Sequence, residues 1–170
     1  MTIELTNRQR FEISGETYWK DLCLNLAYQE ALYREALKCD RMEVLENSGS
    51  FDTGLVRRLR FIIPIQAPAA IHKVVGSEVH IEQHSEFDAQ KRTWTYRIVP
   101  SMLKDRIDIR GVMHVEQREG AIEQVTLNTI GCRMFGLGGI IEPFVARSTE
   151  DGHKDAAAFT RRWIAQHQLK

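Results

Sequence analysis

The sequence predicts an α+β fold in which one curved, seven-stranded antiparallel sheet holds a long C-terminal helix. Two observations carry this prediction: period-two alternation of polar and apolar residues recurs in stretches separated by short turns, and the last part of the chain has helical periodicity. Strands joined by such short breaks must be antiparallel, because a parallel return needs a crossover of a dozen or more residues. With 170 residues and 43% hydrophobic content, the chain has the size and composition of a single domain, 1–170.

The expected strands are separated by Gly, Pro, Asn and Asp turn residues. Their ranges are 2–13, 41–48, 54–66, 77–88, 92–100, 106–118 and 121–135. One face of most strands is apolar and the other polar, which is the pattern of an antiparallel sheet covered on one side. The last strand is ambiguous, because Val125 and Leu127 lie on the face opposite to Ile130. A β-bulge near Asn128 would reconcile these residues.

Helical composition follows the first strand, over residues 14–39. Ser14 is a residue type that commonly caps a helix N-terminus. The apolar periodicity changes phase near Leu26, which predicts two short helices or one helix that bends. A short helical turn is expected at 68–75, and the C-terminal helix at 140–168, after a Gly-rich turn.

This order of elements resembles the START-like, helix-grip superfamily, which includes polyketide cyclases and the birch-pollen-allergen group. The segment GLGGIIEPFVARSTEDGHKDAAAFTRRWI (136–164) is similar to the last turn and helix of an uncharacterised bacterial START-like family. That family has a Gly-rich turn, an apolar pair with Glu-Pro or Glu-Lys, and a helix ending near a Trp. The resemblance covers the whole chain and implies the helix-grip fold. It leaves the activity open, because this superfamily hosts transporters, cyclases, hydrolases and co-chaperones on one scaffold.

Composition excludes several classes of protein. Lys+Arg and Asp+Glu both number 23, so the excess of cations that a polybasic nucleic-acid binder needs is missing. Three cysteines without a CxxC pair fit neither a disulfide framework nor a zinc ribbon. The N-terminus has no signal-peptide pattern, and the longest uncharged apolar run is 61–65. We therefore expect a cytoplasmic bacterial protein with no stable membrane insertion, no nucleic-acid partner and no cofactor; its oligomeric state is left open.

The C-terminal helix predicts a cavity. Its apolar stripe is bulky at both ends and small in the middle, at Ser148, Gly152 and Ala156, so a helix laid across a curved sheet would leave space beneath its midpoint. The alternative to a cavity is that large side chains of the sheet, such as Trp94 and Tyr96, fill this space. Polar residues on inward faces need partners, water or a ligand. The residues expected to line a ligand-binding cavity are Asn7, Gln9, Phe61, Ile63, Ile81, Gln83, Ser85, Trp94, Tyr96, Ile98, Ile109, Met113, Leu127, Val145, Ser148, Gly152, Ala156 and Phe159.

A metal site is not expected. His80, Glu82 and His84 share one face of a strand, with His114 facing the same way two strands on. Ligands two residues apart on a strand are about 7 Å apart, and this face has the composition of a solvated surface. We therefore interpret these residues as surface residues.

A basic run in the second part of the sheet has a similar interpretation. Arg57, Arg58 and Arg60 stand close together, with Arg58 and Arg60 opposite Leu59 and Phe61. An anionic headgroup would suit such a cluster. An exposed edge or outer face explains it more simply.

Three classes of function remain open. The favoured one is binding or carriage of a hydrophobic small molecule (lipid, sterol-like or polyketide-like) between the sheet and the C-terminal helix, with no catalytic residues assigned, because no buried acid–base pair is evident in the sequence. The first alternative is an enzyme of the polyketide cyclase/aromatase type. The second is a regulatory protein-interaction module whose cavity is vestigial.

Overall fold

The computed structural model describes residues 2–102, 105–133, 136 and 138–170. Seven strands form one antiparallel sheet in the order β1-β7-β6-β5-β4-β3-β2, so the first strand lies beside the last. The strands are β1 (Thr2–Phe11), β2 (Arg41–Ser50), β3 (Gly54–Pro64), β4 (Glu78–Asp88), β5 (Thr93–Pro100), β6 (Ile107–Arg118) and β7 (Ala121–Cys132). The α+β helix-grip prediction is confirmed.

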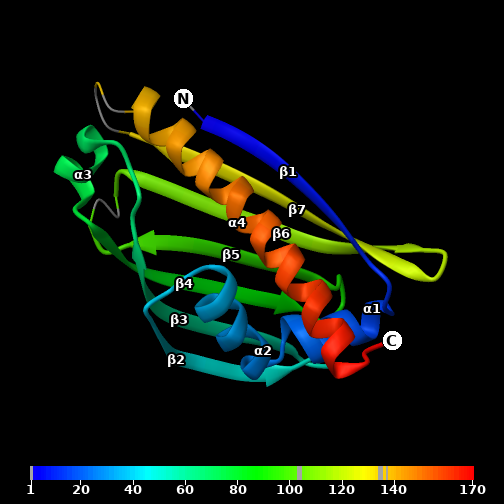
Figure 1. Cartoon of the computed structure of the whole chain (residues 1–170). Coiled ribbons are helices and arrows are strands. Elements are labelled where there is room, and N and C mark those ends of the chain that lie inside the picture. The colour runs from blue at the N-terminus through cyan, green and yellow to red at the C-terminus, as the bar shows by residue number, and fades with distance from the viewer. Residues whose placement is uncertain (1, 103–104, 134–135, 137) are drawn as a thin grey trace.

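The helices lie on one face of this sheet (Figure 1). Between β1 and β2 the chain forms two short helical units, one of the two arrangements that the change of phase predicted. Each unit has an α-helical start and a π-helical end. They are α1 (Gly15–Thr17) with η1 (Tyr18–Cys23), and α2 (Leu26–Ala31) with η2 (Leu32–Ala36). Ser14 caps the first unit by accepting a hydrogen bond from Thr17 N. The short helix α3 (Ala69–Val75) follows β3, and α4 (Gly138–His167) crosses the sheet.

The ends of some elements differ from the prediction. The first strand stops at Phe11, and the last strand stops at Cys132; the predicted strand residues 134–135 lie outside the described residues. The predicted bulge in the last strand is wrong, because β7 pairs with β1 and with β6 in continuous register. Asn128 therefore faces α4, together with Thr126 and Ile130.

Among the residues that the structure describes, the hydrophobic core falls into three clusters. The largest fills one end of the sheet, where Trp19, Tyr28 and Phe159 pack with Phe87 and other buried residues. A second joins η2 to β3 and contains Tyr33, Cys39, Leu59 and Phe61. The third joins α4 to the ends of β6 and β7 through Ile107, Cys132 and Ile141. A small domain normally has one contiguous core, so this division indicates that something separates the clusters.

Candidate functional site

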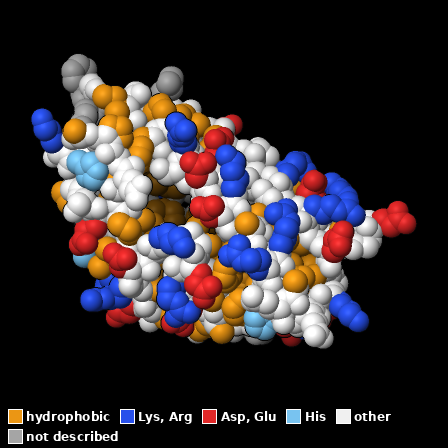
Figure 2. Space-filling view, viewed as in Figure 1, with side chains coloured by type: hydrophobic (Ala, Val, Ile, Leu, Met, Phe, Trp, Pro, Cys, Tyr) orange, Lys and Arg blue, Asp and Glu red, His pale blue; other side chains and the backbone are white. Residues whose placement is uncertain are grey.

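A cavity of ≈ 730 Å³ separates the three clusters. It lies between α4 and the sheet, and residues of all three clusters line it, among them Tyr28, Phe61 and Ile141. Figure 2 shows its mouth as a hollow walled by hydrophobic side chains, between α3 and α4. The volume is within the range of small-molecule sites, which are typically about 300–1,000 Å³.

Most of the wall is apolar and comes from the middle strands of the sheet. Alternation along β3, β4, β5 and β6 turns every second side chain toward α4. The apolar lining residues from these strands include Phe61, Ile63, Val79, Ile81, Trp94, Ile98, Ile107, Ile109 and Met113. The helix contributes Val145, Gly152 and Ala156 opposite them. A wall of this kind removes apolar ligand surface from water without offering a charge.

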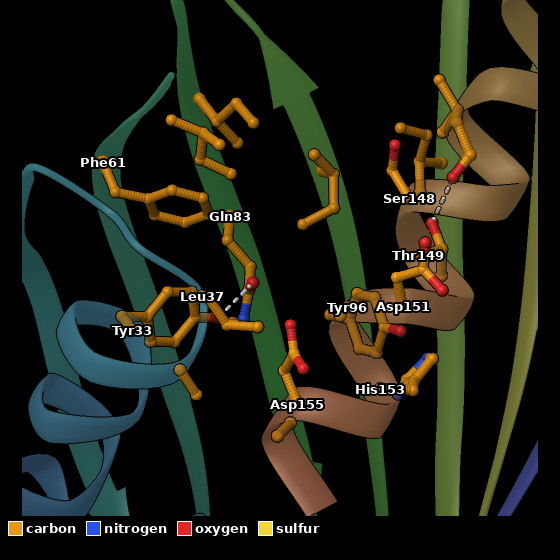
Figure 3. Close-up of a pocket in the computed structure, with 18 of the residues that line it drawn as sticks. Tyr33, Leu37, Phe61, Gln83, Tyr96, Ser148, Thr149, Asp151, His153 and Asp155 are labelled. Carbon is orange, nitrogen blue, oxygen red and sulfur yellow. Dashed lines mark hydrogen bonds between the residues drawn. The ribbon is translucent and has the colours of Figure 1, made fainter. Parts of the chain in front are cut away.

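One polar group of the wall joins the second helical unit to the sheet. The Tyr33 hydroxyl donates to Gln83 Oε1 over 2.6 Å, and Gln83 Nε2 donates to Ser85 Oγ over 3.0 Å. Figure 3 shows Tyr33 and Gln83 meeting at the side of the pocket near η2. Burial raises the pKa of Tyr33 well above its usual range, so its phenol stays protonated.

A second polar chain, Tyr96–Asn128–His153, joins the sheet to α4. The Tyr96 hydroxyl donates to Asn128 Oδ1, and Asn128 Nδ2 donates to His153 Nε2 over 3.0 Å. Tyr96, Gly111 and Asn128 are register partners on β5, β6 and β7. A Cβ at Gly111 would overlap Tyr96 Cζ, so this glycine leaves the space in which the Tyr96 ring crosses β6 to reach Asn128.

This second chain is uncharged at neutral pH. Burial raises the pKa of Tyr96 to about 12, and burial lowers the pKa of His153 below its ordinary value. Because Asn128 donates to Nε2, the proton of the neutral imidazole lies on Nδ1. The chain is therefore a neutral polar strip on an otherwise apolar wall.

Charged side chains lie at the mouth of the cavity. Asp151 and Asp155 are exposed residues of α4 that also line the pocket, and Figure 3 shows both beside it. Asp151 forms an ion pair with Lys154 over 3.3 Å. Lys38 follows η2 and donates from Nζ to the Glu35 carbonyl over 2.6 Å.

The structure brings together most of the residues predicted to form the site. Those that line the cavity are Gln9, Phe61, Ile63, Ile81, Gln83, Trp94, Tyr96, Ile98, Ile109, Met113, Val145, Ser148, Gly152 and Ala156. Whether any of them contacts a ligand stays a prediction.

Four predicted site residues do not line it. Leu127 is 46% exposed and faces away from α4, because the continuous register of β7 turns its even-numbered residues inward. Phe159 is buried in the largest core cluster against Tyr28. Ser85 lies behind Gln83, from which it accepts a hydrogen bond, and Asn7 is half-buried on β1 away from the pocket wall.

Tyr33, Asn128 and His153 line the cavity but were not predicted from the sequence. A bulge was expected near Asn128, whose inward position follows once β7 is read in one register. His153 adjoins Gly152, so the small middle of the helix stripe indicated its neighbourhood but not its side chain. Nothing in the sequence indicated that Tyr33 reaches across to β4.

The interpretation of the basic run Arg57, Arg58 and Arg60 as an exposed edge or outer face is wrong for Arg57. Arg57 is fully buried, whereas Arg58 and Arg60 form ion pairs with Glu82 on the outer face. Alternation along β3 places Arg57 on the covered face, where it contacts the end of η1 rather than solvent.

Of the histidines considered as metal ligands, His84 and His114 lie on the outer face of the sheet, whereas His80 is half exposed and also lines the pocket. His80 contacts Glu78 over 3.1 Å and His84 contacts Glu82 over 3.3 Å. Within the part of the chain that the structure describes, no three His, Cys, Asp or Glu side chains come close enough to hold a metal ion. No helix among the described residues combines the length and the apolar character needed to cross a membrane.

Solved structures share this fold at low sequence identity. A protein from Thermus thermophilus, TTHA0849, has a TM-score of 0.69 and 13% identity, with 97% of this chain and 99% of that chain covered. The Zhui aromatase/cyclase from a Streptomyces species has a TM-score of 0.66 and 13% identity, with 95% and 96% covered. Norcoclaurine synthase from Thalictrum flavum, in complex with dopamine and hydroxybenzaldehyde, has a TM-score of 0.66 and 12% identity, with 100% and 90% covered.

These likenesses establish the START-like helix-grip fold and nothing about the ligand. No curated protein matches the sequence. One family of sequences does match, over residues 6–164, and its description is "Protein of unknown function (DUF2505)". Because the match spans most of the chain, the chain belongs to the DUF2505 family.

Proposed function

We propose that this protein binds and carries an elongated hydrophobic small molecule in the cavity beneath α4, without catalysing a reaction on it. The observation that carries the proposal is the ≈ 730 Å³ cavity, which divides the core and is walled mainly by aliphatic and aromatic side chains. Burying ~300 Å² of apolar ligand surface would contribute about 7–8 kcal/mol at ~25 cal/mol/Å². The loss of ligand freedom offsets part of this, so we expect micromolar affinity.

Gly152 offers a way to close the cavity without adding charge. It is half-buried in α4 and lines the pocket, and a Cβ there would lie 3.7 Å from Leu37 Cδ2 on the other side of the mouth. Because that Cβ would already be in van der Waals contact with Leu37, the rest of the Gly152→Leu side chain would have to occupy the pocket or displace Leu37. Gly139→Leu is the matched control, because Gly139 is exposed on the same helix and a Cβ there would have no heavy atom within 4 Å.

The experiment measures binding of the neutral fluorescent probe N-phenyl-1-naphthylamine, together with native mass spectrometry of the purified protein. We expect Gly152→Leu to lower probe affinity at least tenfold and Gly139→Leu to leave it unchanged. If folded Gly152→Leu binds the probe as well as the wild type does, the site is elsewhere or does not exist. If no variant binds any apolar probe and no ligand co-purifies, the interaction-module alternative gains.

A cyclase-type enzyme is the second candidate. What favours it is the Tyr96–Asn128–His153 chain, which puts a phenol and an uncharged imidazole on one wall of the cavity. Such a pair can exchange a proton with a bound molecule. Co-purification of a cyclised or dehydrated product, and its loss in Tyr96→Phe, would support this candidate over a carrier.

A further inference from the structure

Among the described residues that line it, the cavity offers no buried Lys or Arg to a negative charge. Among the lining residues that the structure describes, Lys38 is the sole Lys or Arg, and its ammonium is exposed and hydrogen-bonded to the Glu35 carbonyl. The carboxylates that line the pocket are Glu78, Asp151 and Asp155. A ligand carboxylate moved into this space would lose its hydration without gaining a cation, which opposes its binding.

The polar groups inside are neutral and already paired with one another, yet the Tyr96–Asn128–His153 chain keeps open positions. Asn128 uses both ends of its amide there. The Tyr96 oxygen retains a lone pair, since it only donates in this chain. His153 Nδ1 carries the proton and has no hydrogen-bond partner among the described residues. The open acceptor on Tyr96 suits a ligand hydroxyl, and the open donor on His153 suits a hydroxyl or a carbonyl oxygen.

We propose that the cavity selects uncharged ligands: an elongated apolar molecule whose hydroxyl or carbonyl oxygen is hydrogen-bonded by the Tyr96–Asn128–His153 chain, in preference to the corresponding carboxylate. This inference rests on the proposed function. The inference adds to the proposed function the polar group of the ligand and the residues that recognise this group. Asp151 and Asp155 add negative charge to the lining at the mouth, which disfavours an anion there.

The test compares two ligands of equal chain length, 1-dodecanol and dodecanoate, as competitors for bound N-phenyl-1-naphthylamine at pH 8. Any apolar pocket favours the alcohol to some degree, so the decisive quantity is the change in preference between variants. Tyr96→Phe removes one hydroxyl and keeps the ring; His153→Leu removes the imidazole and keeps an apolar side chain. His84→Leu is the control, because His84 lies on the outer face of β4 with 45% of its side chain exposed.

We expect the wild type and His84→Leu to bind dodecanol at least tenfold more tightly than dodecanoate. Tyr96→Phe and His153→Leu should each weaken dodecanol binding by about three- to tenfold, the effect of one lost neutral hydrogen bond, and leave probe and dodecanoate binding within twofold. Equal affinity for the two ligands in the wild type, or dodecanol binding unchanged in Tyr96→Phe, would overturn the inference while leaving the cavity as a binding site. Failure of the probe to bind the wild type would overturn the proposed function and this inference with it.

Discussion

Replacing Arg57 tests how the first helical unit is held on the sheet. Arg57 is fully buried in β3, and its guanidinium donates to the carbonyl oxygens of Cys23 over 3.0 Å and Leu24 over 2.6 Å. These carbonyls come at the end of η1, where a helix has no partners of its own for its last acceptors. Nε donates to Asn47 Oδ1 over 2.9 Å, and the guanidinium lies 5.3 Å from the centroid of the Trp94 ring.

The expected cost of Arg57→Met follows from these contacts. Burial lowers the pKa of Arg57, but an arginine stays protonated, so three charge-assisted hydrogen bonds are lost together. Each hydrogen bond to a charged group contributes about 1.5–3 kcal/mol, and such contributions do not add fully. Removing one side of a buried charged interaction typically costs ~3–5 kcal/mol, and we expect Arg57→Met to lower the free energy of unfolding by that amount.

The assay is urea unfolding followed by circular dichroism, with Arg58→Met as the matched control. Arg58 is the next residue on the same strand, but its side chain is 42% exposed and contacts Glu82 over 3.4 Å, so its loss should cost less than ~1 kcal/mol. Arg57→Lys keeps the charge and loses the fork geometry, and should fall between the two. A cost for Arg57→Met within about 0.5 kcal/mol of that for Arg58→Met would refute the reasoning.

Two further predictions concern the chain at the cavity wall. Gly111→Ala should lower the free energy of unfolding by about 1–3 kcal/mol, because the new Cβ would overlap Tyr96 Cζ. Gly131→Ala is the control and should not lower it, because a Cβ there would lie 3.7 Å from Thr2 Oγ1. Equal losses of stability in the two variants would contradict the placement of the Tyr96 ring. Because burial lowers the pKa of His153, the unfolded chain takes up its proton more readily, so stability should fall as the pH drops below about 6.5. His153→Gln should flatten the pH dependence of the free energy of unfolding between about pH 7 and 5, and an unchanged slope would argue against it.

The strand pattern was predictable from sequence wherever one face of a strand is buried and the other is solvated. A one-residue slip in such a strand exposes its whole apolar set, so alternation specifies which side chains face α4. This logic placed Phe61, Gln83 and Tyr96 on the cavity wall. It failed in β7, where Val125 lies on the face away from α4 and is still only 1% exposed, beside its register partners Arg8 and His114. Because β7 has apolar residues on both of its faces, alternation alone does not predict which face is turned toward α4.

The other misses depend on contacts between distant segments. Arg57 is buried because the end of η1 supplies carbonyl acceptors, and no periodicity within β3 contains that information. Tyr33 reaches Gln83 across 50 positions of sequence, and His153 reaches Asn128 across 25. Local sequence patterns predict which face of a strand or helix is buried. The position and rotation of a helix over the sheet, in contrast, are set by packing among several elements.

The size of the cavity limits what fills it in the free protein. Voids left in cores by large-to-small substitutions cost about 24 cal/mol per Å³. A dry, rigid void of ≈ 730 Å³ would then cost about 18 kcal/mol, which exceeds the ~5–15 kcal/mol net stability of an ordinary domain. The space beneath α4 is therefore not a dry void. Its hollow mouth and its neutral polar strips allow water to occupy it, and a ligand that replaces this water stabilises the fold by an amount that grows with ligand concentration.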